Sequence, residues 1–354
     1  MQTNGTIDRN VKDYQTLMSP RQLLTDLPRT DAMTQTVQHG RTSIRNILDG
    51  TDSRKFVIVG PCSIHDAEVA HDYAARLKEV SDAVSDRVVV IVRSYFEKPR
   101  TSLGWKGLIY DPHLNGAGDI KDGLYISRRI LMDNLEIGLP CATEYLETFT
   151  PQYNSDLVSW AAIGARTTES PQHRQLASGL SMPVGFKNST QGDISVAVNA
   201  ILSANGEHSF LGIDGYGAPS VVRTTGNPYT HIVIRGSNTG VNYDSQSVQD
   251  IQAMLTEEDL PPNVVIDCSH GNSEKDYSKQ PTVFEEILKQ IRDGNDGIVG
   301  IMLESNISAG SQKIPSDLTG FDRSTLEYGV SVTDSCIDWD TTASLLKDAH
   351  KSLA

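Results

Sequence analysis

The sequence predicts an α/β protein, a TIM (β/α)8 barrel with an N-terminal helical extension and an inserted β-hairpin. From residue 55 onward, short β-branched runs alternate with amphipathic helical segments, and eight such strand–helix units follow one another. Continuous apolar strands are typical of a parallel sheet that helices cover. The main alternative is a doubly wound open sheet, which has less support because no GxGxxG turn follows the first strand.

The eight expected strands are short, and the segments after them carry apolar residues at helical spacing. In 66–84, for example, Val69, Tyr73, Leu77 and Val80 fall on one helix face. We expect strands at 56–62, 88–94, 141–145, 162–166, 184–187, 231–235, 264–270 and 298–304. We expect the longest helices at 66–84, 124–137, 245–255, 282–292 and 340–353, with shorter ones beginning near Ser170 and Asp193.

Two segments stand outside this repeat. Residues 1–50 are polar and have helical patterning at 19–26 and 31–48, so we expect an N-terminal arm for subunit contacts and regulation, followed by a catalytic barrel over 51–354. Residues 208–224 contain two apolar runs around a turn, with no helix between them. This pattern predicts a β-hairpin between strands five and six.

Composition limits the partners and the compartment. The 31 Lys and Arg against 45 Asp and Glu give a formal net charge of −14, so no long-range field attracts nucleic acid or an anionic membrane. No apolar run approaches the length of a membrane span, and the start of the chain lacks an apolar signal segment. The four cysteines form no CxxC pair. We expect a cytoplasmic protein with reduced thiols.

Each expected strand has a chemically active ionisable residue at its end or one position before it. In a TIM barrel the catalytic groups lie at the carboxyl ends of the strands. One charged residue at a strand end is ordinary surface, but eight around one mouth indicate a site. In chain order these residues are Cys62, Arg93, Glu144, Arg166, Lys187, Arg235, His270 and Glu304.

The cations among these residues favour an anionic ligand. Arginine forks and lysine ammonium groups suit a molecule that carries both a carboxylate and a phosphate. Lys98 and Arg100, in the loop after the second strand, offer a place for a second phosphate. A solvated basic loop is the alternative interpretation of that segment.

The remaining residues offer donors for a metal ion. Cys62, His270 and Glu304, with Asp334 as a fourth, supply sulfur, nitrogen and oxygen. This mixture suits one divalent transition metal ion better than Ca²⁺ or Mg²⁺. Taken singly, Cys62 would be a core thiol and His270 a satisfied barrel histidine. Their joint position at strand ends favours a metal site.

All of these positions except Arg93, Glu144 and Asp334 lie in seven motifs: GPCSIHD at 60–66, YFEKPRTSLGWKGLIYDPHLNG at 95–116, GARTTES at 164–170, PVGFKN at 183–188, HIVIRG at 231–236, IDCSHGNS at 266–273 and IMLES at 301–305. Together they resemble the type I 3-deoxy-arabino-heptulosonate 7-phosphate (DAHP) synthases, over residues 15–350. The resemblance implies condensation of phosphoenolpyruvate with erythrose 4-phosphate and water, the first step of the shikimate pathway to the aromatic amino acids.

The resemblance also implies roles for individual residues. One divalent ion (Mn, Fe, Co or Zn) would bind Cys62, His270, Glu304 and Asp334. The substrate-binding residues would be Arg93, Lys98, Arg100, Thr101, Ala165, Arg166, Lys187 and Arg235, with the KPRT motif at 98–101 receiving the aldose phosphate. The catalytic residues would be Lys98, Cys62, His270 and Glu144, with Glu144 orienting the water. Which acid protonates the alkoxide stays open.

A feedback site for an aromatic amino acid is implied as well, in a homodimer or homotetramer. The matching positions are Pro151, Gln152, Leu176, Leu180, Ser181, Phe210, Gly212 and Val222. Phenylalanine-sensitive members of the family tend to carry serine where this chain has Gly212. The missing side chain leaves room for a phenolic hydroxyl, so we expect L-tyrosine to be the inhibitor.

Two other functions are compatible with the residues. Lys187 could be the nucleophilic amine of a Schiff-base aldolase. Alternatively, the cations could bind a sugar phosphate without turnover in an allosteric module, although the metal donors argue against that. Phosphate release from phosphoenolpyruvate that requires erythrose 4-phosphate separates the three possibilities.

Overall fold

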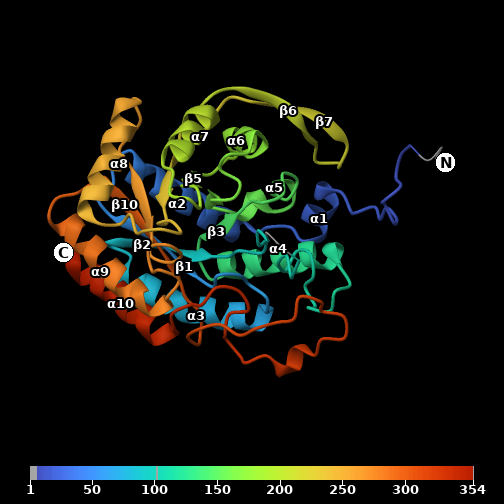
Figure 1. Cartoon of the computed structure of the whole chain (residues 1–354). Coiled ribbons are helices and arrows are strands. Elements are labelled where there is room, and N and C mark those ends of the chain that lie inside the picture. The colour runs from blue at the N-terminus through green and yellow to red at the C-terminus, as the bar shows by residue number, and fades with distance from the viewer. Residues whose placement is uncertain (1–5, 101–102, 354) are drawn as a thin grey trace.

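The computed structural model describes residues 6–100 and 103–353, and it confirms the TIM barrel with its N-terminal helices and its hairpin (Figure 1). Eight parallel strands close in the order β1-β10-β9-β8-β5-β4-β3-β2. The strands are β1 Lys55–Gly60, β2 Val88–Arg93, β3 Cys141–Glu144, β4 Trp160–Ile163, β5 Val184–Lys187, β8 Thr230–Ile234, β9 Val264–Asp267 and β10 Ile298–Glu304.

Helices surround this barrel. They are α3 Ala67–Val84, α4 Ile120–Glu136, α5 Pro151–Asn154, α6 Pro171–Ser178, α7 Ser195–Asn205, α8 Ser245–Glu257, α9 Gln280–Arg292 and α10 Trp339–Ser352, with 3-10 turns at Ser155–Leu157, Tyr277–Lys279 and Arg323–Thr325. Local capping fixes several starts; the Asp66 side chain, for example, accepts hydrogen bonds from two backbone N–H groups of the first turn of α3. α5 has four residues, too few for a periodic pattern, so the sequence did not indicate it.

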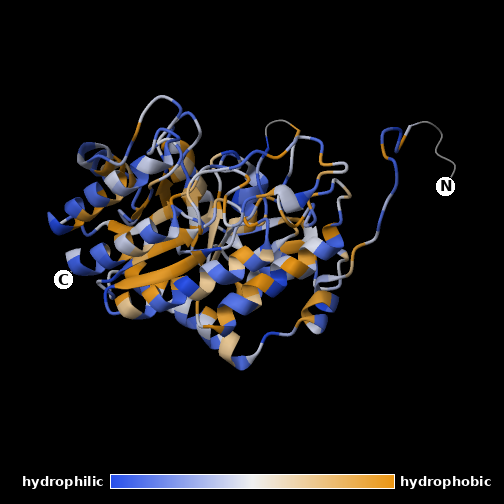
Figure 2. Ribbon diagram, turned by 90° about the horizontal axis from the view of Figure 1, so that it is seen from below, coloured by the Kyte–Doolittle hydropathy of each residue, from blue (hydrophilic) through white to orange (hydrophobic). Residues whose placement is uncertain are grey.

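Two apolar layers hold the barrel together. One lies between the strands and the outer helices, where the helices turn their hydrophobic faces inward (Figure 2). The other fills the barrel interior and includes Phe56, Ile91 and Trp160. Helix α2 (Asp31–Leu48) contributes Ile44 and Ile47 to this interior cluster. Helix α2 thus adds apolar side chains to the barrel interior. The charged residues of the predicted site lie at the carboxyl ends of the strands or in the loops that follow them.

The hairpin consists of β6 (His208–Ile213) and β7 (Pro219–Thr224) and lies over α6 (Figure 1). Its tip contacts the first helix, α1 (Pro20–Asp26), because Arg21 N donates to Gly215 O at 2.8 Å. The Arg21 guanidinium also stacks on the Tyr216 ring at 5.1 Å. The N-terminal segment and the hairpin are therefore in direct contact within one chain.

The expectation that all eight ionisable residues end their strands was half right. Arg93, Glu144, Lys187 and Glu304 are the last residues of β2, β3, β5 and β10. Cys62, Arg166, Arg235 and His270 instead follow their strands within the loops. His270, for instance, has a φ of 60°, a left-handed conformation that no strand contains.

In the described part of the chain, no helix combines the length and the hydropathy needed to cross a bilayer.

Candidate active site

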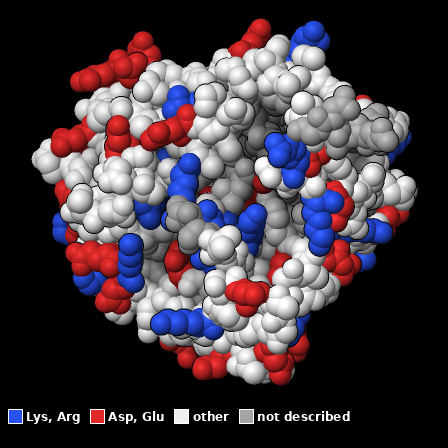
Figure 3. Space-filling model, turned by 45° about the vertical axis from the view of Figure 1, so that its right-hand side comes forward, with Lys and Arg blue, Asp and Glu red and all other residues white. Residues whose placement is uncertain are grey.

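The predicted cations gather around one cavity of about 90 Å³ at the carboxyl end of the barrel. Blue side chains surround a hollow on this face (Figure 3). The cavity is lined by seven of the eight predicted substrate-binding residues, which are Arg93, Lys98, Arg100, Ala165, Arg166, Lys187 and Arg235. The eighth, Thr101, lies outside the described residues. Glu144, His270 and Asp334 line the same cavity.

Arg93 is fixed on all sides. Its side chain is 1% exposed, and its Nε donates to Pro61 O at 3.0 Å while its Nη2 donates to Glu304 Oε1 at 2.9 Å. The guanidinium carbon also lies 3.6 Å from the centre of the Tyr95 ring. A buried ion pair of this kind needs such additional partners. Arg93 therefore presents a rigid positive edge to the cavity.

Lys187 forms a second buried ion pair. Its Nζ lies 2.7 Å from Asp267 Oδ2, and both side chains are at most 5% exposed. Lys187 and His270 hold the pKa of Asp267 well below its usual value, although burial alone would raise it. The contact with Asp267 fixes the position of Lys187 Nζ at the cavity.

Two further arginines have no acidic partner in the described part of the chain. Neither Arg166 nor Arg235 has a carboxylate within 4.0 Å there. The Nη1 atom of Arg235 is buried and has no hydrogen-bond partner among these residues. Burial lowers the pKa of Arg235, yet arginine remains charged in proteins. A buried guanidinium N–H without a partner indicates that an anion completes this site.

Glu144 lies at the same cavity because residue 164 is glycine. A Cβ atom at Gly164 would lie 1.9 Å from Glu144 Oε1, so any side chain there would displace the carboxylate. Glu144 is 7% exposed and is the last residue of β3. Glu144 is therefore an acidic side chain at the edge of a cationic cavity, as its predicted role of orienting a water molecule requires.

The KPRT loop brings its lysine to the predicted metal donors. Lys98 Nζ donates to Cys62 Sγ at 3.0 Å, and the loop is closed by a hydrogen bond from Lys98 N to Lys106 O at 2.8 Å. Arg100 is exposed, and its Nε donates to Trp105 O at 2.9 Å. One lysine thus contacts the donor set while the neighbouring arginine remains free to reach a second anion.

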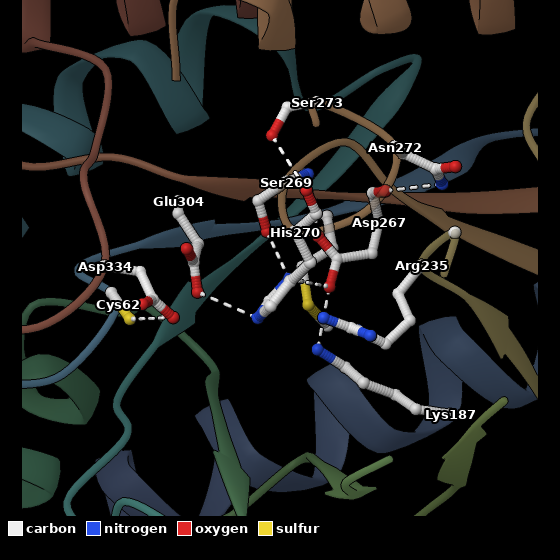
Figure 4. Close-up of polar contacts among 12 residues, drawn as sticks. Cys62, Lys187, Arg235, Asp267, Ser269, His270, Asn272, Ser273, Glu304 and Asp334 are labelled. Carbon is white, nitrogen blue, oxygen red and sulfur yellow. Dashed lines mark hydrogen bonds and ion pairs between the residues drawn. The ribbon is translucent and has the colours of Figure 1, made fainter. Parts of the chain in front are cut away.

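Three of the four predicted metal donors form a tight cluster, and the fourth, His270, lies next to Glu304 (Figure 4). Ligand atoms of Cys62, Glu304 and Asp334 are all within 4.8 Å of one another. Cys62 Sγ lies 3.7 Å from Asp334 Oδ2, and His270 Nε2 lies 3.7 Å from Glu304 Oε1. Burial and then the Glu304 carboxylate raise the pKa of the Cys62 thiol to about 11. A cation would relieve this repulsion, so the donor set fits a divalent metal ion.

A second, larger cavity of about 500 Å³ adjoins the first. Arg166, Arg235, His270 and Asp334 line both cavities. Hydroxyl groups, such as that of Ser311, line much of the rest. The site can therefore hold a small dianion and a longer hydroxylated molecule side by side.

Three buried polar residues that sequence reasoning missed support these groups. Asp267 contacts both Lys187 and His270. Gln280 binds the backbone of Glu304 twice, as donor to its O at 3.0 Å and as acceptor from its N at 2.9 Å. Glu97 accepts hydrogen bonds from the loop after β3, and burial raises its pKa to about 8. Asp267 and Glu97 belong to the motifs IDCSHGNS and YFEKPRT, and this membership could have marked them as residues of the site.

The predicted feedback residues lie on α5, α6 and the hairpin. Phe210 and Gly212 pair with Val222 and Ser220 across the hairpin. The face that carries Phe210, Gly212 and Val222 is half-buried, and β6 packs against α6. Leu176 and Leu180 are buried, at or just after α6, and Pro151 is buried in α5, whereas Gln152 and Ser181 are exposed.

A closed (β/α)8 barrel with a cation-lined cavity beside a mixed sulfur, nitrogen and oxygen donor set defines a class of barrel enzymes that act on small phosphorylated anions. Residues 30–347 match the DAHP synthetase I family. The chain belongs to this family.

Full-length relatives agree with this assignment. The chain is 46% identical over 353 residues to the Tyr-sensitive phospho-2-dehydro-3-deoxyheptonate aldolase of Escherichia coli (strain K12), covering 100% of this chain and 98% of the relative. It is 45% identical over 340 residues to the Phe-sensitive protein of the same organism, covering 96% and 95%. A solved structure of phospho-2-dehydro-3-deoxyheptonate aldolase from Francisella tularensis SCHU S4 superposes with a TM-score of 0.93 at 44% identity, covering 97% of this chain and 98% of that one.

Proposed function

We propose that this chain is a DAHP synthase, which condenses phosphoenolpyruvate with D-erythrose 4-phosphate and water to give DAHP and phosphate. One observation carries the proposal. Among the described residues, Arg235 Nη1 has no hydrogen-bond partner and Arg166 has no acidic partner, and both arginines line a small cavity that His270 and Asp334 also line. An anionic substrate and a metal-assisted carbonyl reaction are thereby brought to one place. Family membership and the names of the relatives support the same reaction.

Phosphoenolpyruvate would occupy the smaller cavity. Arg93 and Lys187 are already paired with acids, so they supply fixed positive edges, whereas Arg166 and Arg235 supply the charge that neutralises the ligand. Erythrose 4-phosphate would lie with its aldehyde near Lys98 and its phosphate near Arg100. Most of the rate enhancement then comes from positioning two anions that otherwise repel each other.

A divalent metal ion bound by Cys62, His270, Glu304 and Asp334 would supply Lewis-acid polarisation of the aldehyde oxygen. Lys98 donates its ammonium hydrogens in the same region, 3.0 Å from Cys62 Sγ. Its charge stabilises the oxygen on which negative charge develops.

The bonds form and break in two stages. C3 of phosphoenolpyruvate bonds to the aldehyde carbon, the aldehyde π electrons move to oxygen, and that oxygen takes a proton. Water, oriented by Glu144, then adds to the electron-poor C2 and loses a proton. The hemiketal phosphate collapses with cleavage of the C2–O bond, and phosphate leaves with the bridging oxygen. Lys98 is a nearby group that can deliver the first proton.

The Schiff-base alternative has less support from the geometry. Lys187 Nζ is engaged in a buried ion pair with Asp267 at 2.7 Å, and that contact would have to be broken before the amine could attack a carbonyl. A binding module without turnover would not need the cluster of Cys62, Glu304 and Asp334 with His270 beside it.

The proposed function includes feedback inhibition by L-tyrosine. The Tyr-sensitive and Phe-sensitive relatives are 46% and 45% identical to this chain, so overall similarity does not choose between them. Gly212 supports tyrosine, because phenylalanine-sensitive members of the family tend to carry serine at this position; a Cβ atom there would lie 2.7 Å from Val222 Cγ2 and crowd the hairpin face. We expect a homodimer or homotetramer in which residues 1–50 contact a partner subunit.

The decisive experiment measures phosphate release with each substrate alone and with both. Release that requires both substrates, stops on chelation and survives borohydride supports the proposal. Inactivation by borohydride in the presence of substrate would favour the Schiff-base aldolase. Binding of sugar phosphate without release would favour the binding module.

A further inference from the structure

Asp267 occupies a position that none of the roles above explains. It is the last residue of β9, and its side chain is fully buried. Its Oδ2 atom lies 2.7 Å from Lys187 Nζ and 3.1 Å from His270 Nδ1. Its Oδ1 atom accepts hydrogen bonds from Ser269 N at 3.0 Å and from Ser269 Oγ at 2.6 Å. One carboxylate therefore joins a substrate-cavity cation to a metal donor (Figure 4).

The hydrogen bonds around Ser269 determine the tautomer of His270. An ionised carboxylate only accepts, so the contact between Ser269 Oγ and Asp267 Oδ1 uses the single hydroxyl proton of Ser269. Ser269 Oγ also lies 2.6 Å from His270 Nδ1. Because the hydroxyl has no second proton to donate, Nδ1 must carry the hydrogen in that contact. The neutral imidazole then has its lone pair on Nε2.

The Nε2 atom is the one that faces the other donors. It lies 3.7 Å from Glu304 Oε1, whereas Nδ1 faces Asp267. The imidazole is held there although His270 has a left-handed backbone with a φ of 60°, which is unfavourable for a residue with a side chain. The turn is supported by Lys275 N, which donates to His270 O at 2.8 Å, and by Asn272 Nδ2, which donates to Asp267 O at 2.9 Å.

We propose that Asp267 is a positioning residue that fixes His270 as the Nδ1–H tautomer and so aims Nε2 at the metal site. The inference rests on the metal site of the proposed function but not on its turnover. Carboxylate partners of metal-binding histidines fix ring orientation, and removing them typically weakens metal binding by about 10- to 100-fold. Asp267 differs from a simple partner of this kind because the same oxygen also holds Lys187. It thereby fixes the spacing between the substrate cation and the metal donors.

The first test reads the tautomer directly in the unaltered protein. Long-range ¹H–¹⁵N correlation spectra of the Zn²⁺-loaded, histidine-labelled chain report which imidazole nitrogen binds metal. We expect Nε2 of His270 to be metal-bound and Nδ1 to carry hydrogen. A metal-bound Nδ1 would overturn the proposal, whether or not the protein turns over substrate and whether or not any variant folds.

The second test measures Co²⁺ affinity by competition with a chromophoric chelator. Asp267→Asn should bind Co²⁺ about 10- to 100-fold more weakly, and Ser269→Ala should lose less because Asp267 still contacts His270. The matched control is Asp156→Asn. It removes the ion pair between Asp156 and the buried Arg128, in which Oδ1 and Nη1 are 2.7 Å apart. This pair contains none of the metal donors, so the variant should bind Co²⁺ normally. Folded Asp267→Asn protein with unchanged affinity would contradict the assignment. An inactive wild type with tight, Asp267-dependent metal binding would refute only the proposed reaction.

Discussion

Lys98 Nζ donates a hydrogen bond to Cys62 Sγ at 3.0 Å, which joins the loop that carries the KPRT motif to the donor set at the start of the β1–α3 loop. The two residues are 36 positions apart in the chain. Cys62 is fully buried, whereas Lys98 lines the cavity at the carboxyl end of the barrel. If the proposed roles hold, the direct contact between Lys98 and Cys62 would couple substrate binding to metal binding.

Cys62→Ala should lose both the metal ion and the activity, because no other soft ligand replaces the sulfur. The measurement is metal content after dialysis, together with the rate of phosphate release. Cys141→Ala is the matched control, since Cys141 is also buried but contacts the backbone of Leu131 and Leu139 instead. Full activity in a verified metal-free preparation of the wild type would contradict this prediction.

The two anion sites should separate by mutation. Arg235→Ala should lower kcat/KM for phosphoenolpyruvate, with a loss of about 2 to 5 kcal/mol of transition-state stabilisation, because the anionic ligand loses a cationic partner. Arg166→Ala should act on the same substrate. Arg100→Ala should mainly raise the KM for erythrose 4-phosphate. Arg129→Ala, an exposed cation on α4, is the control and should change neither. Equal effects of the three cavity variants on both substrates would show that the assignment is wrong.

Gly212→Ser should weaken inhibition by L-tyrosine. The added side chain meets Val222 Cγ2 at 2.7 Å from the new Cβ, so the half-buried face of the hairpin has to shift. The inhibition constant for each aromatic amino acid is the measurement. Gly215→Ser, in the same hairpin, is the control because nothing lies within 4 Å of a Cβ atom there. A wild type that responds to phenylalanine or tryptophan and ignores tyrosine would refute the inference from Gly212.

His231 should make the fold acid-sensitive. Its Nε2 accepts a hydrogen bond from Trp160 Nε1 at 3.1 Å, and burial lowers its pKa from 6.5 to about 4. As pH falls, the unfolded chain therefore takes up this proton before the folded protein does. The free energy of unfolding is nearly independent of His231 above about pH 6.5 and decreases below it. The loss attributable to His231 between about pH 7.5 and about pH 5 should be about 2 kcal/mol.

Urea unfolding at both pH values measures this effect. His231→Gln keeps an acceptor for Trp160 but does not titrate, so its pH dependence should be smaller than that of the wild type by the same amount. An identical pH dependence in the two proteins would mean that His231 takes up its proton equally in the folded and unfolded states.

Much of the fold was predictable because a parallel barrel has a fixed polarity. Eight apolar runs with helices between them define the strands, and each carboxyl end then opens at the same mouth. Arg93, Lys187 and Glu304 were identified in this way. The strand boundaries at Cys62 and His270 were predicted too late in the chain, because loop conformation depends on backbone angles that side-chain pattern does not show.

Asp267 is a residue of the site that could not be identified from the sequence. Its neighbours Val264, Val265 and Ile266 form an apolar strand, so one carboxylate after them resembles an ordinary strand end. Its contact with His270 depends on the left-handed turn between them, and its contact with Lys187 depends on the barrel interior. Glu97 was missed for a similar reason, because its burial depends on the distant Leu146 to Thr150 loop.

The most direct test of the central claim follows the bridging oxygen of phosphoenolpyruvate. Phosphoenolpyruvate labelled with ¹⁸O between C2 and phosphorus is incubated with enzyme, metal ion and erythrose 4-phosphate, and the released phosphate is analysed by mass. If the cationic cavity holds the substrate for attack at carbon, the phosphate retains the label and appears only when erythrose 4-phosphate is present. Unlabelled phosphate would mean cleavage at phosphorus, and phosphate release without the aldose would mean hydrolysis without condensation; either result would contradict the proposed reaction.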